Sequence, residues 1–241
     1  MRMRKKKHRD ERLSLCSEFI YEPSGEVLCD PSGELFSSKG SPVYLEIGAG
    51  KGGFAVGMVK KHPDACSIAL ERVTDCVMLA AERAKREAPE AKLLFVNESA
   101  DDLTRLFAPG TVDAIFLNFS DPWSKKGYSK RRLTHRRYLA VYMSLLKLGG
   151  TLTFKTDNTG LFDFTLEELS ASGITPDAVT RDLHNSEYNE GNVVTEYEAN
   201  FSSLGQKINM LKLTKREEST LEIPEELSRD RKSYTRIGEG E

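Results

Sequence analysis

The residues with the clearest chemical potential lie in a glycine-rich turn that follows the first apolar run. The turn reads LEIGAGKGGF, and its Gly48, Gly50 and Gly53 have the G-x-G-x-x-G spacing that lets a nucleotide-like ligand approach the backbone closely. Glu71 ends the next apolar run, where a carboxylate can accept hydrogen bonds from both ribose hydroxyls of a bound nucleoside. The pattern predicts a nucleoside-containing cofactor but fits a dinucleotide and S-adenosylmethionine equally well.

A further carboxylate in the same turn separates these two cofactors. Glu46 stands two residues before the first glycine, where it would repel a nearby pyrophosphate. S-adenosylmethionine carries a sulfonium and an ammonium group, so an acidic neighbour suits it. We therefore predict S-adenosylmethionine as the cofactor, and an NAD-dependent dehydrogenase that uses the same turn stays the alternative.

A second group of candidate residues follows the fourth apolar run, in the segment NFSDPW. Asp121 and the single tryptophan, Trp123, would lie at the carboxyl edge of the predicted sheet, where ligands of open α/β sheets bind. Trp123 could stack on a base or pack beneath the loop. Residues 125–137 then carry seven positive charges in thirteen residues without an acid. A segment of one charge sign beside a ligand crevice favours a polyanionic substrate, namely a nucleic acid.

Alternating apolar and amphipathic stretches predict the elements that position these residues. Short runs rich in β-branched residues predict strands at 43–48, 66–71, 92–97, 112–119 and 151–156. Amphipathic stretches predict helices at 53–61, 74–87, 100–107, 135–148 and 162–170, with Gly149-Gly150 as a helix stop. Two further strands are expected at 177–183 and 206–214, on either side of a polar loop at 181–192. The fold class expected is α/β and Rossmann-like, with a mostly parallel twisted sheet, helices on both faces and a C-terminal antiparallel strand.

The two ends of the chain differ from its middle. Residues 1–40 are predicted to form a basic irregular arm, residues 41–216 the catalytic domain, and residues 217–241 a charged peripheral tail. No apolar run approaches the ~20 residues of a membrane span, and no signal-type stretch follows the basic start, so we expect a cytoplasmic protein without membrane contact. The four cysteines and four histidines lack metal-ligand spacing, so no metal site is expected.

Five motifs connect these patterns to a known family. The segments GAGKGGF, NFSDPWSKK, KRRLTHRRYL, FKTDNTGLF and NVVTEYEANFSSLGQ closely resemble the bacterial tRNA (guanine-N7-)-methyltransferase family. The resemblance covers residues 42–213 and, more loosely, the opening MRMRKK. It implies a class I methyltransferase fold, S-adenosylmethionine as cofactor and tRNA as partner. It also implies the reaction, transfer of a methyl group to N7 of guanine 46 in the variable loop.

The resemblance also implies roles for individual residues. Cofactor positions are Glu46, Glu71, Asn97 and Asp121, together with Gly48 and Gly50 of the turn, and Asp121 is the expected catalytic residue. Substrate positions are Lys125, Asp157, Thr195, Glu196, Tyr197 and Glu198. The RNA-contacting stretch is 127–132, in which the basic residues are Lys130, Arg131 and Arg132.

The chain departs from the family pattern at a few positions. Asn97 stands where the family usually has Asp, and the segment after it is two residues longer. Ser124 replaces a common Pro, and Gly127-Tyr128-Ser129 replaces a more charged trio. The region after Arg216 has no counterpart in the family pattern.

The expected chemistry makes modest demands on the protein. Guanine N7 has an in-plane lone pair and no proton, so no general base is needed and the enzyme mainly supplies proximity and orientation. Asp121 could accept hydrogen bonds from guanine N1–H and the exocyclic amine, and could stabilise the positive charge that forms on the ring. Asp157 could do either. A catalytically inactive RNA-binding relative is the remaining alternative, and the oligomeric state cannot be predicted from the sequence.

Overall fold

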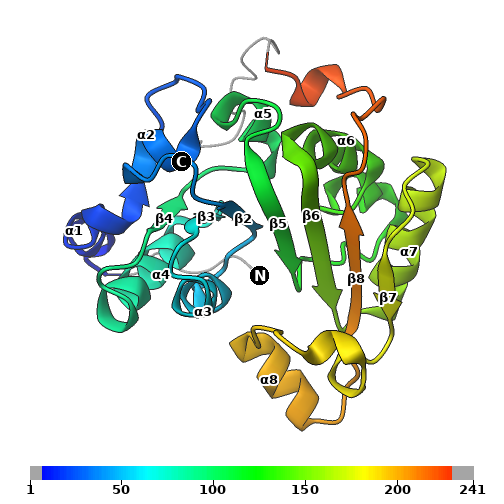
Figure 1. Cartoon of the computed structure of the whole chain (residues 1–241). Coiled ribbons are helices and arrows are strands. Elements are labelled where there is room, and N and C mark those ends of the chain that lie inside the picture. The colour runs from blue at the N-terminus through cyan, green and yellow to red at the C-terminus, as the bar shows by residue number, and fades with distance from the viewer. Residues whose placement is uncertain (1–6, 230–241) are drawn as a thin grey trace.

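The computed structural model describes residues 7–229, which form an eight-stranded sheet flanked by helices (Figure 1). The strand order is β1-β4-β3-β2-β5-β6-β8-β7. The strands are β1 (Ile20–Tyr21), β2 (Val43–Ile47), β3 (Cys66–Leu70), β4 (Leu93–Val96), β5 (Val112–Asn118), β6 (Leu146–Thr156), β7 (Ala178–Thr180) and β8 (Asn209–Thr214). All neighbours pair in parallel except β8, which is antiparallel to both β6 and β7. The predicted fold class is confirmed.

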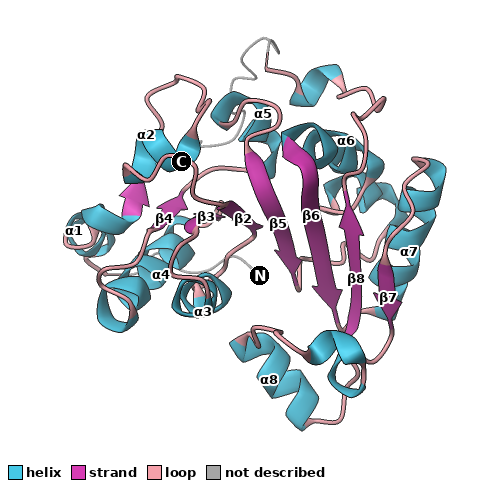
Figure 2. Ribbon diagram, in the orientation of Figure 1, coloured by secondary structure: helices cyan, strands magenta, loops and turns pink. Residues whose placement is uncertain are grey.

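Helices cover the two faces of the sheet and build two separate hydrophobic clusters (Figure 2). On one face lie α1 (Arg9–Ser14), α3 (Gly53–Lys61) and α4 (Thr74–Glu87). The other cluster packs α2 (Pro31–Phe36), α5 (Leu103–Leu106), α6 (Arg136–Leu145) and α7 (Thr159–Ala171). A last helix, α8 (Glu196–Ser203), lies beyond the carboxyl ends of β5 and β6. The helices on the two faces thus leave uncovered the edge at which the parallel strands end.

The N-terminal region is more ordered than the sequence predicted. Residues 9–14 form α1, which packs on α4 with the Arg12 guanidinium paired to Glu82 at 2.7 Å. Residues 20–21 form β1, which pairs with β4 and extends the sheet. Asp30 caps α2, since its carboxylate accepts from the Gly33 amide. The irregular arm expected for residues 1–40 is therefore wrong for the described part, because its scattered apolar residues pack on the sheet rather than on one another.

The boundary between α6 and β6 also differs from the prediction. Helix α6 ends at Leu145, and β6 begins at Leu146, so Gly149-Gly150 lies inside the strand instead of ending a helix. The two glycines pair with the Lys215 backbone, through Gly149 N–H to Lys215 O at 2.8 Å and Lys215 N–H to Gly150 O at 2.8 Å. A Cβ on Gly150 would lie 2.9 Å from Lys147 O. The glycines therefore permit a close backbone approach within the sheet.

The region after β8 is partly built into the core. Leu227 is 1% exposed, and its carbonyl accepts a hydrogen bond from Thr104 Oγ1 at 2.5 Å. Glu226 lies 3.8 Å from the Arg137 guanidinium of α6. Residues 221–229 therefore brace α5 and α6 and are not peripheral as predicted. The remainder of the predicted tail, residues 230–241, lies outside the described residues, and the predicted domain boundaries stay a prediction.

Candidate active site

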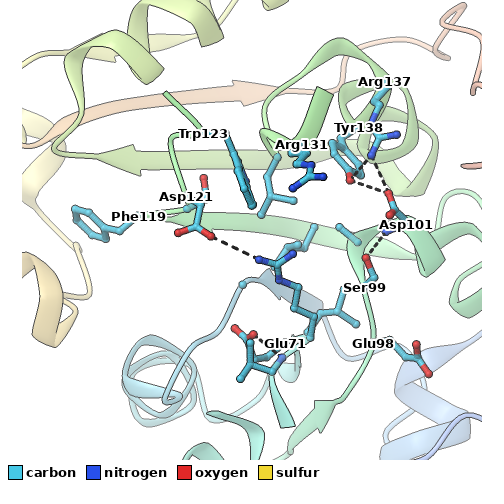
Figure 3. A pocket seen from close by; sticks show the side chains of 18 residues that line it. Glu71, Glu98, Ser99, Asp101, Phe119, Asp121, Trp123, Arg131, Arg137 and Tyr138 are labelled. Atoms are coloured by element: carbon cyan, nitrogen blue, oxygen red, sulfur yellow. Dashed lines mark hydrogen bonds and ion pairs between the residues drawn. The ribbon is translucent and has the colours of Figure 1, made fainter. Parts of the chain in front are cut away.

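A cavity of about 430 Å³ lies at the carboxyl ends of β2, β3, β4 and β5 (Figure 3). Because these strands are parallel, their last residues all lie at one edge of the sheet, and side chains far apart in sequence meet there. The lining residues are Ile47, Gly48, Leu70, Glu71, Arg72, Val73, Glu98, Ser99, Ala100, Asp101, Phe119, Ser120, Asp121, Trp123, Arg131, Leu133, Arg137 and Tyr138. Three predicted cofactor residues, Gly48, Glu71 and Asp121, are brought together here with Arg131, which was predicted to contact RNA.

The glycine-rich turn has the backbone that its sequence predicts, although not through the expected third glycine. Gly48, Gly50 and Gly52 all have positive φ, at 84°, 54° and 73°. Gly52 is the residue before α3, and a Cβ there would meet Ala80 Cβ at 2.8 Å. Gly52 rather than Gly53 therefore allows the turn to pack against α4. The G-x-G-x-x-G spacing includes Gly53 but not Gly52, so the motif alone did not indicate the role of Gly52.

Glu71 joins the turn to the end of β3. Its Oε2 accepts from the Gly50 amide at 2.9 Å, and its Oε1 accepts from the Val73 amide at 2.8 Å. A carboxylate offers about four lone-pair sites, so each oxygen can still accept one more hydrogen bond. These oxygens face a cavity in which a nucleoside ribose could supply the donors.

Asn97 does not line the cavity, contrary to the predicted cofactor contact. Its amide donates to the Glu71 carbonyl at 2.9 Å, and its Oδ1 accepts from Thr74 Oγ1 at 2.8 Å. Both ends of the amide are thus used within the protein. The next two residues, Glu98 and Ser99, line the cavity instead. The placement of Asn97 therefore does not support the predicted cofactor contact, and the two residues after it are the ones that reach the cavity.

Glu46 is buried beneath the turn rather than exposed in the cavity. Its Oε1 accepts from Asn118 Nδ2 at 3.1 Å, while Oε2 has no partner among the described residues. Burial raises the pKa of Glu46 to about 7, although the Asn118 hydrogen bond and the charge of Lys155 act in the opposite direction. An unpartnered buried carboxylate oxygen favours a ligand that brings a donor or a positive charge.

The loop that carries Asp121 is held in an uncommon backbone conformation. Phe119 and Trp123, on either side of Asp121, have φ values of 51° and 42°. For a non-glycine residue such angles are costly, and they often occur where function requires a defined loop shape. The Asp121 side chain is 71% exposed and lies 3.7 Å from the Arg72 guanidinium across the cavity. The loop therefore presents a carboxylate rather than burying one.

The basic segment after this loop divides into two groups. Arg132 donates to Pro122 O at 2.9 Å and Trp123 O at 3.2 Å, so it supports the Asp121 loop. Arg136 is bound to Glu168, and Arg137 to Asp101. These three guanidinium groups are therefore used within the protein. The predicted RNA contact at Arg132 is not supported by its placement.

Arg131, Lys125 and Lys130 have a different environment. Arg131 lies over the rings of Trp123, at 5.0 Å, and Tyr128, at 4.7 Å, which leaves its guanidinium edge at the cavity. Lys125 and Lys130 are exposed and form no ion pair with a described residue. Arg131 thus lines the cavity, whereas Lys130 lines a separate pocket with Arg136 and Arg137.

The predicted substrate residues of the second half come from the ends of β6 and α8. Thr195 and Glu198 form a capping box at the start of α8, because the Thr195 side chain accepts from the Glu198 amide at 2.9 Å. Glu196 pairs with Arg83 of α4. No helix was predicted from the sequence at Glu196–Ser203. The capping residues T-x-x-E were the signal for a helix.

Two of these residues stay available beside the cavity. The Tyr197 ring is 44% exposed and lies 5.0 Å from the ring of Phe119, which lines the cavity. Burial and the neighbouring charge of Asp157 raise the pKa of Tyr197. Tyr197 therefore adjoins the cavity through Phe119, and Asp157 lies near enough to Tyr197 for its charge to act on the phenol.

The cavity also contains residues that sequence reasoning missed. Asp101 accepts from Tyr138 Oη at 2.7 Å and from Arg137 Nη2 at 3.0 Å, which ties α6 to the end of β4. Arg72 follows Glu71 directly. Both Arg72 and Asp101 lie within a few residues of a predicted strand end. They could have been found from the rule that ligands of open α/β sheets bind beside the carboxyl ends of the strands.

Two searches of the described residues gave no further candidate. Among residues 7–229 no group of three His, Cys, Asp or Glu side chains has a metal-binding arrangement. No helix in that part of the chain is long and apolar enough to cross a membrane.

Comparisons with known proteins agree with this geometry. The family model described as "Putative methyltransferase" matches residues 40–211. The tRNA (guanine-N(7)-)-methyltransferase of Bacillus subtilis strain 168 is 46% identical over 169 residues, which cover 70% of this chain and 78% of that protein. A protein of the same name from Lachnoclostridium phytofermentans is 46% identical over 179 residues, covering 74% and 82%.

A solved structure supports the fold independently. The 16S rRNA methyltransferase KamB superposes with a TM-score of 0.54 at 12% identity and covers 72% of this chain and 87% of that chain. At this identity the likeness concerns the fold alone. The family model and the relatives cover most of the chain, so the protein belongs to the tRNA (guanine-N7-)-methyltransferase family.

Proposed function

We propose that this protein transfers a methyl group from S-adenosylmethionine to N7 of guanine 46 in the variable loop of tRNA. One observation carries the proposal. The exposed carboxylate of Asp121 lines a cavity that suits a nucleoside, in the loop that leads directly into the exposed basic residues. A cofactor site alone, or a basic surface alone, would not require an exposed carboxylate at the position of Asp121.

The cavity residues fit S-adenosylmethionine. The free lone pairs of Glu71 would accept from the ribose hydroxyls, and Glu98 or Ser99 would replace Asn97 at the adenine end. Glu46 is buried beneath the turn and does not line the cavity, so it would favour the cationic methionine end through its negative charge and not by direct contact. When bound, S-adenosylmethionine supplies an activated methyl group. A dinucleotide pyrophosphate has no such use for Glu46, which disfavours the dehydrogenase alternative.

The guanine would enter from the side of Asp121, Asp157 and Tyr197. Asp121 would accept hydrogen bonds from guanine N1–H and the exocyclic amine, which orients N7 and stabilises the charge that methylation places on the ring. Tyr197 offers an exposed aromatic face beside Phe119 on which a base could stack. Asp157 would hold the base from the β6 side. No proton has to leave N7, so none of these groups acts as a base.

The tRNA backbone would lie along the outward-facing cations. Arg131 lines the cavity, Lys125 and Lys130 are exposed in the same segment of the chain, and all three would neutralise phosphates. We propose that the protein acts on tRNA in the cytoplasm, and the second alternative, an inactive RNA-binding relative, is disfavoured by the exposed Asp121.

Nucleoside analysis tests the proposal directly. The full chain is incubated with bulk tRNA and methyl-labelled S-adenosylmethionine, and the digested nucleosides are separated. We expect label in 7-methylguanosine, and no label in a transcript with adenine at position 46. A labelled ribose or a different base would overturn the proposed substrate. Titration with NAD and with S-adenosylmethionine separates the cofactors.

A further inference from the structure

A buried lysine at the end of β6 connects the two halves of the site. The Lys155 side chain is 3% exposed, and its ammonium group donates three hydrogen bonds. The acceptors are Asn192 Oδ1 at 2.9 Å, Val193 O at 3.0 Å and Glu198 Oε2 at 2.6 Å. An ammonium has three donors, so its capacity is fully used by residues of the segment before and within α8.

Glu198 is equally committed to this network. Its side chain is fully buried, and Oε2 accepts from Lys155 while Oε1 accepts from Asn192 Nδ2 at 2.6 Å and lies 2.8 Å from His184 Nε2. Burial acts to raise the pKa of Glu198, but the charge and hydrogen bonds of its partners outweigh it and lower the pKa. A carboxylate held in this way has no exposed oxygen to offer to guanine.

The network sits against the residues that shape the site. The Lys155 ammonium lies 5.4 Å from the Phe54 ring and 5.9 Å from the Phe119 ring. Phe119 begins the Asp121 loop with its positive φ, and its ring contacts Tyr197 of α8. One ammonium group therefore touches the start of the catalytic loop and holds the helix that faces it.

We infer that Lys155 is a positioning residue, which sets α8 and Tyr197 relative to the Asp121 loop through its buried ion pair with Glu198. Glu198 accordingly contacts Lys155 and not the substrate, unlike the role that the family resemblance implies for it. The inference rests on the proposed function for its effect on methylation. The placement of α8 can be measured without that function.

The experiment is a double-mutant cycle with Lys155→Met, Glu198→Gln and the combined variant in the full chain. Each single change leaves one buried charge without its partner, which is strongly destabilising, whereas the combined variant leaves no unpaired ion and is expected to fold. Single-turnover methylation of tRNA is measured over a pH series, because Lys155→Met removes a charge that lowers the pKa of Glu46, and a loss caused by protonated Glu46 would recover at high pH. Lys212→Met on β8 serves as control, because Lys212 is an exposed lysine on the neighbouring strand.

We expect the combined variant to regain its melting temperature and bind S-adenosylmethionine normally, yet to methylate tRNA on the order of 100-fold more slowly. Its loss should not exceed that of the worse single variant, because both residues act through one contact. Recovery of the rate together with stability would overturn the inference, since the pair would then serve stability alone. Losses that multiply would also overturn it, because Glu198 would then act on guanine independently.

Hydrogen exchange gives a readout that does not depend on activity. Amides of residues 192–203 should exchange faster in the combined variant, while those of α4 stay protected. Unchanged protection of residues 192–203 would overturn the positioning role even if methylation fell. Absence of 7-methylguanosine with the unaltered protein would overturn the proposed function instead, and the exchange result would still decide the placement of α8.

Discussion

The two edges of the cavity are held in place by different means. At the cofactor edge, positive-φ glycines and backbone amides bind the Glu71 carboxylate, so the main chain sets the geometry. At the substrate edge, side chains do so: Lys155 holds Glu198, and Arg132 supports the Asp121 loop. A main-chain site is sensitive to an added Cβ, whereas a side-chain site is sensitive to a lost charge. The following predictions test this distinction.

The largest effect is expected at the substrate edge, from Asp121→Ala. Loss of one preorganised electrostatic contact typically lowers the rate by ~10²–10³-fold. The exposed side chain has little part in packing, so the melting temperature should hardly change. Single-turnover methylation and thermal unfolding on the same preparation measure both. A near-normal rate would remove Asp121 from the reaction.

Glu46 lies beneath the turn, and its pKa predicts a pH-dependent stability. The folded-state pKa of about 7 exceeds the ordinary value of 4.5, so the folded protein binds more protons than the unfolded chain between these pH values. The free energy of unfolding should therefore fall as pH rises from about 4.5 to about 7, by about 3 kcal/mol from this group. Glu46→Gln should lack that contribution in denaturant titrations across the same range.

The raised pKa of Glu46 also predicts a pH dependence of cofactor binding. If ionised Glu46 favours the cationic end of S-adenosylmethionine, affinity should weaken as pH falls below about 7. Calorimetric titration of Glu46→Gln should show weaker binding without that pH dependence. Equal pH profiles for the two proteins would mean that Glu46 supports the turn and does not act on the ligand.

A matched glycine pair probes the main chain at the cofactor edge. A Cβ at Gly52 would meet Ala80 Cβ at 2.8 Å, while a Cβ at Gly50 would have no atom within 4 Å. Both residues have positive φ, so both alanine variants carry backbone strain of about 1–2 kcal/mol. Gly52→Ala should lose more stability and more cofactor affinity than Gly50→Ala. Equal losses would show that conformation matters and packing against α4 does not.

The smallest effect concerns two neighbouring basic residues. Lys130→Ala should reduce the slope of log K for tRNA against log salt by roughly one unit, because one phosphate contact is lost. Arg132→Ala should leave the slope unchanged and lower the melting temperature and the methylation rate, since Arg132 supports the Asp121 loop. Filter binding over a salt series, with thermal unfolding, distinguishes the two. Equal slopes for both variants would contradict the division of the basic segment.

The accuracy of sequence reasoning followed the range of the interactions involved. The strands β2 to β5 and the helices α3 and α4 were predicted within a residue or two, because their apolar periodicity is local. Gly149-Gly150 was misread, because a glycine pair signals a helix stop and a close strand approach equally well. The order of N-terminal residues 9–36 depends on packing against α4, β4 and the central core, which no local pattern reveals.

The sequence by itself determined the family and the glycine turn, and it predicted that Glu71 and Asp121 meet at one cavity, because both follow strand ends that parallel pairing brings to one edge. Only the tertiary structure decided which charges remain available. Arg132, Arg136 and Glu198 have charges that would suit a substrate contact, but other groups of the protein bind them: Pro122 O, Glu168 and Lys155. Charge is a property of a residue type, whereas a free charge depends on which neighbours the fold supplies.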